Sequence, residues 1–152
     1  MRTFNEGQKE FRRATTGEIL FFIREESRRG PTAGLGDLES LTAFDLRQEM
    51  TYLIFLDARP VGFASVKFGA TSQDRRLTKL YVTPEARRYG CASYVMRGLK
   101  ITQTTIPVTN IQFISLCRKL GFHYNPTQTY PKSIAELTRP YFEVSNVPAA
   151  KL

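Results

Sequence analysis

The chain has 152 residues, of which 22 are Lys or Arg, 14 are Asp or Glu, one is His, two are Cys and none is Trp. This length suits one globular domain, and 41% hydrophobic with 24% charged residues exclude a wholly disordered chain. The sequence holds no apolar run of roughly 18 residues, no secretory signal, and too few Cys and His for a disulfide scaffold or a zinc site. We therefore expect a single cytoplasmic domain over residues 1–152, with no membrane segment and no metal.

The net charge of +8 is concentrated in the middle of the chain. Residues 59–100 carry nine basic and two acidic side chains, whereas residues 34–58 carry one basic and five acidic side chains. A nucleic-acid-binding module more often shows a basic tail, or a helix face of Lys and Arg interleaved with stacking aromatics. Neither pattern is evident in this sequence. A concentrated central patch of charge therefore fits a compact polyanionic ligand at least as well as nucleic acid.

The first third of the chain predicts one strand and two helices. Residues 9–14 are expected to form a short strand. Thr15 precedes Glu18 by three residues, which is the spacing of a capping box, and apolar residues follow at helical spacing. A helix is therefore predicted over residues 16–28. A weaker apolar pattern predicts a second helix from residue 38 to about residue 50.

The middle of the chain changes to strand periodicity. Residues 51–57 and 61–68 are dense in β-branched and aromatic side chains, and Arg59-Pro60 between them is expected to form the turn of a hairpin. A polar loop then leads to a third strand over residues 75–82. A proline ends this strand, because proline has no N–H to donate to a neighbouring strand.

The last third alternates helices and strands. Apolar residues at i, i+3, i+4 and i+7 predict a helix over residues 91–100, and a short strand is expected over residues 104–109. Asn110 is a good cap for a further helix, which a glycine ends. A strand is expected over residues 134–142, and residues 143–152 are expected to form a loose tail. This order predicts an α/β domain with a mixed sheet covered by helices.

Residues 77–93 carry the clearest chemical signal. A strand ends at a proline turn, Arg87 and Arg88 follow, and Gly90 leads into a helix. A helix N-terminus offers unpaired N–H groups to an anion. Gly90 and the small Ala92 let a phosphate approach the backbone, and the arginines can neutralise its charge. The alternative is an ordinary connection between a strand and a helix, whose arginines point to water.

Two segments of the chain resemble motifs of the GNAT superfamily of acetyl-CoA-dependent N-acetyltransferases. The first resembles the acetyl-CoA-binding signature, through Leu77, Leu80, Val82, Pro84, Arg87, Gly90 and Ala92. The second resembles a downstream family motif, through Asn110, Leu116, Gly121 and Phe122. The resemblance implies a GNAT-like fold: a central, mostly antiparallel sheet, splayed at the cofactor cleft and flanked by about four helices.

The resemblance also implies a reaction, the transfer of acetyl from acetyl-CoA to an amine by direct attack. The thioester carbonyl would be polarised by backbone N–H groups near residues 80–82, and the pyrophosphate would lie on residues 87–93. The implied cofactor-binding residues are Leu80, Tyr81, Val82, Arg87, Arg88, Tyr89, Gly90, Cys91, Ala92, Ser93 and Asn110. The acceptor amine, in a small molecule or a protein, is not identified by the sequence, which also leaves a homodimer open.

Two cysteines have two interpretations each. Cys117 stands where the family commonly has a Tyr that reprotonates the CoA thiolate, and a thiol, with an ordinary pKa of about 8.5, is a possible substitute. Alternatively, Cys117 is a core residue on the apolar helix face of Phe113 and Leu116. Cys91 either has a thiol pKa that is lowered by the helix N-terminus and the two arginines beside it, or is only a small residue of the loop.

The general base is also atypical. Many relatives hold a Glu on the strand that ends at the proline turn, but residues 75–82 contain no carboxylate. The base must come from Asp57 or the acidic segment 37–49, or else the amine arrives neutral. That segment either attracts a cationic amine or is a solvated helix face; its acidic residues are Asp37, Glu39, Asp45 and Glu49. The missing Glu and Tyr keep a second function open, that of a GNAT-fold protein without catalysis that binds CoA or serves as a structural or interaction protein.

Overall fold

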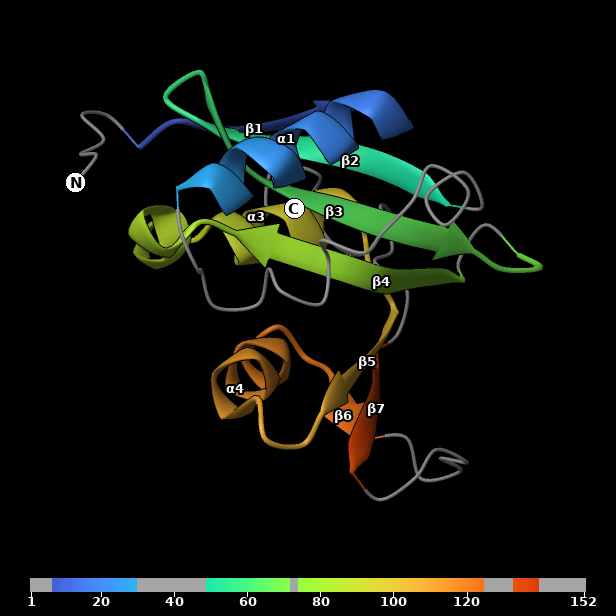
Figure 1. Ribbon diagram of the computed structural model, residues 1–152. Helices are drawn as coiled ribbons and strands as arrows, with labels where there is room; N and C mark the ends of the chain where they lie inside the picture. The colour runs from blue at the N-terminus through green and yellow to red at the C-terminus, as the bar shows by residue number, and fades with distance from the viewer. Residues whose placement is uncertain (1–6, 30–48, 72–73, 125–132, 140–152) are drawn as a thin grey trace. The chain divides into compact units, whose positions relative to one another are not determined.

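The computed structural model describes residues 7–29, 49–71, 74–124 and 133–139. In chain order the elements are β1 (Lys9–Arg13), α1 (Thr16–Arg28), β2 (Met50–Leu56), β3 (Arg59–Phe68), β4 (Arg75–Val82), the 3-10 helix η2 (Pro84–Tyr89), α3 (Cys91–Gly98), β5 (Gln103–Pro107), α4 (Ile111–Lys119), β6 (His123–Tyr124) and β7 (Ile134–Thr138). The strands are hydrogen-bonded in the order β1-β2-β3-β4-β5-β7-β6 (Figure 1). The predicted mixed α/β sheet is therefore confirmed.

The chain divides into two compact units, and β4 contributes residues to both. The first unit contains Met1–Lys67 and Lys79–Val95, and the second contains Phe68–Thr78 and Met96–Leu152. Among the helices that the structure describes, none is long and apolar enough to cross a membrane.

The first helix, α1, forms where the capping box predicts it. The Thr15 side chain accepts a hydrogen bond from the Glu18 N–H (3.1 Å), and the Glu18 carboxylate accepts one from the Thr15 N–H (2.9 Å). The hydrogen bond from the Thr15 backbone, together with the Arg12 side chain, lowers the pKa of Glu18. The capping box thus supports a helix over residues 16–28, because it gives hydrogen-bond partners to backbone N–H groups at the helix start.

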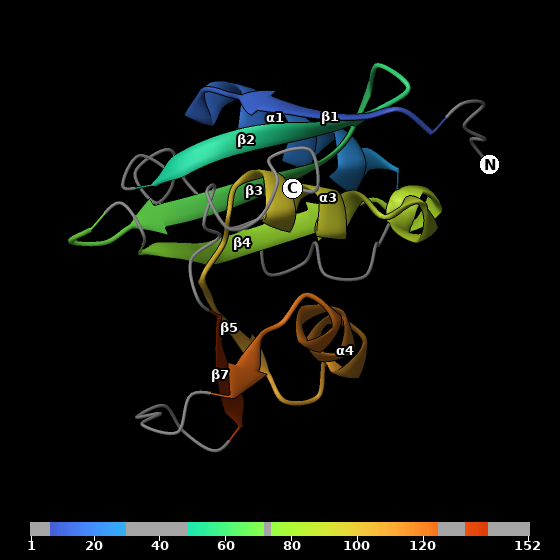
Figure 2. The same cartoon turned by 180° about the vertical axis from the view of Figure 1, so that it is seen from behind.

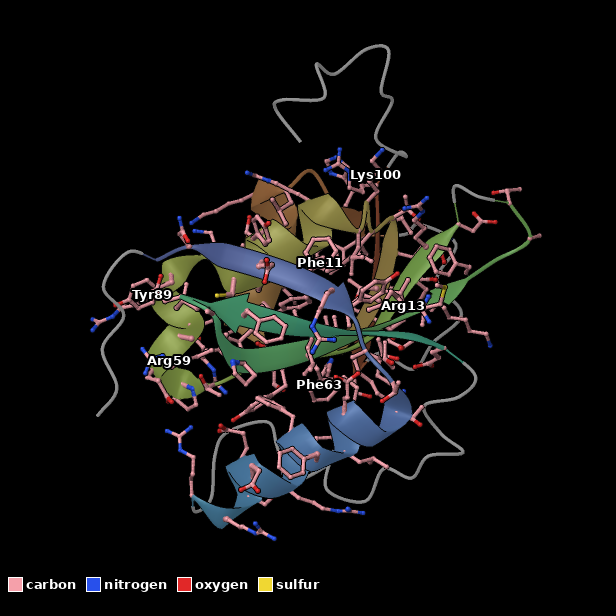
Figure 3. The ribbon with its side chains drawn as sticks, turned by 90° about the horizontal axis from the view of Figure 1, so that it is seen from above. Phe11, Arg13, Arg59, Phe63, Tyr89 and Lys100 are labelled. Atoms are coloured by element: carbon pink, nitrogen blue, oxygen red, sulfur yellow. The ribbon has the colours of Figure 1, made fainter. Side chains whose placement is uncertain are left out.

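The core of the first unit lies between α1 and the sheet. Helix α1 covers one face and α3 lies on the other, as the two opposite views show (Figures 1 and 2). In Figure 3, Phe63 points from the sheet toward α1, whereas Phe11 lies on the α3 side. The centroid of the Phe11 ring lies 5.8 Å from that of the Tyr94 ring of α3. Because both faces are covered, β2 is an almost unbroken apolar run. The cluster beneath α1 comprises Ala14, Ile19, Phe22, Ile23, Leu53, Phe63 and Tyr81.

The hairpin of β2 and β3 turns two residues earlier than expected. Asp57 and Ala58 form the turn, with φ of 50° and 66°, and the prediction of a turn at Arg59-Pro60 was wrong. A two-residue hairpin turn of type I′ needs positive φ at both central positions to match the strand twist, whereas proline fixes φ near −65°. Pro60 instead lies in β3 opposite Phe55, beside an irregularity in the pairing.

Other boundaries also differ from the prediction. The second predicted helix was expected to reach about Met50, but Met50 begins β2 and pairs with Val66. The rest of that helix, from residue 38 to residue 48, lies outside the described residues. The helix predicted over residues 91–100 ends at Gly98.

In the second unit, β5 pairs in parallel with β4 and antiparallel with β7. The β4 pairs are Arg76 with Gln103 and Leu77 with Thr104, and β7 pairs along the whole of β5. The separation of β4 from β5 that the GNAT-like fold implies involves both units and stays a prediction.

Helix α4 ends at a Schellman motif, in which the N–H of Gly121 (φ 95°) donates to the Arg118 carbonyl and that of Phe122 donates to the Cys117 carbonyl. Gly121 and Phe122 of the second motif thus end α4 through the positive φ of the glycine and these two backbone hydrogen bonds.

Candidate cofactor and catalytic site

The connection from β4 to α3 is held in place by backbone hydrogen bonds and a 3-10 helix. Thr83 donates its N–H to the Val61 carbonyl at 2.7 Å, which holds the end of β4 beside β3. Pro84 then occupies the first helical position of η2, where its missing N–H and fixed φ cost nothing. Ala86 is buried and donates its N–H to the Thr83 carbonyl at 3.0 Å. Where the sequence predicts only a proline turn, the structure has a six-residue 3-10 helix.

Gly90 joins η2 to α3 in a conformation that favours glycine. Its φ is 78° and its ψ is 21°, in the left-handed region. An added Cβ would meet no atom within 4 Å, so the backbone conformation, and not crowding, accounts for a glycine here. The carbonyl of Gly90 accepts the Tyr94 N–H at 3.0 Å, which is the first hydrogen bond of α3.

The two arginines of η2 are exposed but differ in their contacts. Arg87 donates from Nε to the Val82 carbonyl at 2.8 Å, and its guanidinium lies 5.7 Å from the centroid of the Tyr81 ring. Arg87 is therefore held against the end of β4. Arg88, the next residue, is exposed to solvent. Both positive charges are close in sequence to the N-terminus of α3, where the first N–H groups of a helix have no partner within it.

The first residue of α3 does not have an activated thiol. Cys91 is fully buried, and loss of solvation raises the pKa of its thiol, although Lys9 acts weakly in the opposite direction. The alternative of a lowered pKa at Cys91 was wrong, since burial outweighs the nearby positive charge. Cys91 thus contributes its backbone N–H to this end of α3, and its side chain to the core.

Ten of the eleven predicted cofactor-binding residues lie in the first unit. They occupy the consecutive elements β4, η2 and α3 and the glycine between the last two. Tyr81 points into the core, with its ring centroid 6.3 Å from that of Phe22. Asn110 lies in the second unit, where its side chain accepts the Phe113 N–H at 3.2 Å and caps α4. A role for Asn110 toward a cofactor stays a prediction.

Among the candidate bases that the structure describes, one reaches β4 from outside that strand. Glu49, just before β2, forms an ion pair with Lys79 of β4 (2.9 Å) and accepts a hydrogen bond from the buried Ser65 of β3. The side chains of Lys79 and Glu49 are only 18% and 12% exposed. Asp57 accepts the Gln8 N–H at 2.9 Å and fixes the β2–β3 turn, whereas the candidates Asp37, Glu39 and Asp45 lie outside the described residues. Of the two described candidates, Glu49 is therefore the one beside β4.

Cys117 is a core residue of the second unit. Its side chain is fully buried, and loss of solvation raises the pKa of its thiol to about 12. Ile114 of the same helix is buried, whereas Phe113 and Leu116 are half-buried. A thiol with so high a pKa is a weak proton donor to a CoA thiolate, so burial favours the packing interpretation. The acid role stays a prediction.

Comparison with known proteins finds similarity in structure only. No known family profile matches the sequence, and no curated protein sequence matches it. Among solved structures, a GNAT-family acetyltransferase from Streptococcus pneumoniae superposes with a TM-score of 0.60 over 89% of this chain and 100% of its own, at 16% identity. Ard1 from Thermoplasma volcanium superposes with a TM-score of 0.64 over 89% of this chain and 99% of its own, at 19% identity.

A third similar structure contains the ligand that the sequence motif implies. The PaiA N-acetyltransferase from Thermoplasma acidophilum, solved in complex with coenzyme A, superposes with a TM-score of 0.56 over 88% of this chain and 99% of its own, at 17% identity. The chain has the GNAT fold. The fold that the two motifs predict is thereby confirmed.

The GNAT fold of this chain carries an ion pair that sequence reasoning missed. Strand periodicity puts Lys79 on the same face as Tyr81, but it gives no sign that Glu49 lies opposite. The two residues are 30 positions apart, and neither is a residue that the two GNAT-like motifs specify. The only sequence signal is the acidic character of the segment before β2.

A cavity of about 580 Å³ lies along α1 in the first unit. Its volume is in the range of small-molecule pockets, and it combines an apolar surface with carboxylates. The lining residues are Thr15, Gly17, Glu18, Phe21, Phe22, Glu25, Glu26, Arg29, Leu53 and Pro60. Within the described ranges, no group of three or more His, Cys, Asp or Glu side chains is close enough to hold a metal ion.

Proposed function

We propose that the protein is an N-acetyltransferase that transfers acetyl from acetyl-CoA to an amine. The observation that carries this proposal is the connection from β4 to α3. Within one short segment it combines two exposed arginines, a glycine at positive φ and the N-terminus of a helix. Together with the GNAT fold, this is an arrangement suited to a pyrophosphate.

In the proposed complex, Arg87 and Arg88 neutralise the pyrophosphate of CoA. The N–H groups at the start of α3, from Cys91 to Ser93, donate hydrogen bonds to its oxygens. The backbone of residues 80–82 pairs with the pantetheine arm and polarises the thioester carbonyl. The CoA complex of the similar PaiA protein supports CoA as the ligand class.

The proposed chemistry is one direct displacement without an acyl-enzyme. The nitrogen lone pair of the amine forms the new C–N bond, and the carbonyl π electrons move onto the oxygen. When they return, the C–S bond breaks and CoA leaves as a thiolate. The proton lost by the amine passes to Glu49, directly or through water, and then to solvent, while the thiolate takes a proton from water or an acidic side chain.

A second candidate function is that of a GNAT-fold protein that binds CoA without catalysis. The observation that favours it is the buried Cys117, whose thiol has a pKa of about 12 at the position where the family commonly has a Tyr acid. The absence of a carboxylate in the sequence of β4 also agrees with it. Turnover separates this function from the first.

The deciding experiment incubates the protein with acetyl-CoA and a panel of small amines and peptides, and measures the release of free thiol. An N-acetyltransferase produces thiol and acetylated amine in equal amounts, and only in the presence of an acceptor. Binding of acetyl-CoA without thiol release from any acceptor supports the second function instead. Pre-incubation with CoA is expected to inhibit turnover, because CoA occupies the same site.

The arginines of η2 provide a test of the phosphate contacts. Arg88→Ala is expected to weaken CoA binding about tenfold or more, because a charge-assisted hydrogen bond contributes about 1.5–3 kcal/mol. Its effect on pantetheine, which has no pyrophosphate, is expected to be small. Arg87→Ala is expected to weaken CoA binding too, and also to lower stability, since Arg87 holds the Val82 carbonyl.

Calorimetric titration of CoA and pantetheine into each variant measures these effects. Arg24→Ala is a matched control, because Arg24 is an exposed arginine of α1 outside the proposed site. Equal losses of CoA and pantetheine affinity would assign the arginines a purely structural role.

Cys117 is expected to stabilise the fold and to be dispensable for turnover. Cys117→Ala should lower the free energy of unfolding by about 1 kcal/mol at pH 7, because it leaves a small cavity. Burial raises the folded-state pKa to about 12, so the buried neutral thiol contributes stability that is fully present below the ordinary thiol pKa and is lost as the pH rises toward 12. The stability gap between wild type and variant should therefore shrink above pH 9. A fall of kcat by more than tenfold, with unchanged acetyl-CoA affinity, would instead establish the acid role.

A further inference from the structure

Arg29 joins the end of α1 to the turn that precedes the proposed phosphate site. Its guanidinium donates from Nη1 to Glu26 of α1 at 2.7 Å and from Nη2 to Glu85 of η2, also at 2.7 Å. Figures 1 and 2 show the C-terminal turn of α1, in light blue, beside η2, in yellow-green. The two elements are 56 residues apart in sequence.

The two carboxylates that Arg29 holds are largely removed from water. The side chains of Glu26 and Glu85 are 5% and 10% exposed, whereas that of Arg29 is 40% exposed. A buried carboxylate is costly without a charged partner. The hydrogen bond to Glu85 is also the main reason that the pKa of Arg29 is raised. A planar guanidinium can serve both acids at once, which a lysine ammonium does with less suitable geometry.

A second set of contacts joins the same elements. Arg87 of η2 donates to the Val82 carbonyl, and its guanidinium lies over the Tyr81 ring. Tyr81 in turn packs against Phe22 of α1. Helix α1 therefore meets the β4–η2 connection both through the core and through Arg29. Removing the Arg29 contact leaves the core contact in place, so η2 is expected to shift without unfolding of the unit.

We infer that Arg29 is a positioning residue for the cofactor loop, which holds η2 through Glu85 so that residues 87–93 keep their phosphate-binding arrangement. This inference rests on the proposed function. Arg29 acts through Glu85, because neither residue belongs to the segment proposed to touch the cofactor. Glu85 lies only two residues before Arg87 and five before Gly90, so a change in η2 reaches both.

The test compares CoA affinity by calorimetry in four single variants and one double variant. Arg29→Ala and Glu85→Gln are expected to weaken CoA binding about tenfold, the scale of coupling between contacting residues. Pantetheine affinity should change less than about threefold, because only the phosphate-binding end of the site moves. Arg29→Lys should restore part of the loss. Arg28→Ala is the matched control, because its ion pair with Glu25 lies within α1 and is exposed.

The double variant Arg29→Ala/Glu85→Gln should lose no more CoA affinity than Arg29→Ala alone, because both changes break the same contact. Glu85→Gln leaves Arg29 paired with Glu26, so it tests the bridge even if Arg29→Ala proves unstable. If wild type binds CoA and Glu85→Gln binds it equally well, the inference is wrong. Equal losses for CoA and pantetheine would also overturn it, because they indicate a general loss of structure. Failure of wild type to bind CoA would instead overturn the proposed function itself, and the inference with it.

Discussion

Glu49→Gln is expected to lower kcat by at least about tenfold, because general base catalysis typically contributes 10²–10⁴-fold. The amide keeps the size of the side chain and can still accept the Ser65 hydroxyl, but it cannot take a proton from the amine. Acetyl-CoA affinity should change little, since Glu49 lies outside the phosphate loop. The measurement is steady-state kinetics with a good acceptor, together with a calorimetric titration of acetyl-CoA.

Asp57→Asn is the matched control for this variant. Asp57 is the other candidate base in the part of the chain that the structure describes, but its carboxylate accepts the Gln8 N–H in the β2–β3 turn. Asparagine can accept the same bond and tolerates positive φ, so kcat should stay close to that of wild type. If Glu49→Gln turns over as fast as wild type, the Glu49–Lys79 pair is structural and Glu49 is not the base.

Gly62→Ala is expected to lower the free energy of unfolding by about 3 kcal/mol or more, at the upper end of overpacking effects. A Cβ at this position of β3 would lie 2.1 Å from the Tyr81 carbonyl oxygen and 3.1 Å from the Val82 Cα. Both atoms belong to the backbone of β4, so no side-chain rotation relieves the clash. Because β4 must move, CoA affinity should fall together with stability.

Gly17→Ala is the matched control, since it adds the same methyl group in α1. Its Cβ would lie 3.8 Å from the Thr15 Oγ1, which is an ordinary contact. Alanine in the first turn of a helix is expected to leave stability unchanged or to raise it by up to about 1 kcal/mol. Urea unfolding of both variants measures the difference. Equal stability of Gly62→Ala and wild type would contradict the close approach of β3 and β4.

Features with local causes could be predicted from the sequence. The capping box at Thr15 and Glu18 fixes the start of α1 within four residues, and the pattern of β4 together with the proline after it fixes the end of that strand. The glycine at position 90 is explained by its own left-handed backbone conformation. The cofactor loop could be located for the same reason, because its chemistry lies in one continuous segment.

Features with non-local causes could not be predicted. The partners in the Glu49–Lys79 pair and in the Arg29–Glu85 bridge could not be matched from the sequence, because each contact joins residues far apart in the chain. The hairpin turn at Asp57-Ala58 was missed for a different reason. Alanine is an unusual residue at positive φ, and the neighbouring proline gives a stronger but misleading turn signal.

The most direct test of the central claim is a calorimetric titration of acetyl-CoA into the wild-type protein, with thermal unfolding measured on the same samples. We predict saturable binding of one acetyl-CoA per chain and a rise in melting temperature. The added stability is about 2.7 kcal/mol at a ligand concentration 100 times Kd. A folded protein that gives no binding heat and no thermal shift at millimolar acetyl-CoA would contradict the account.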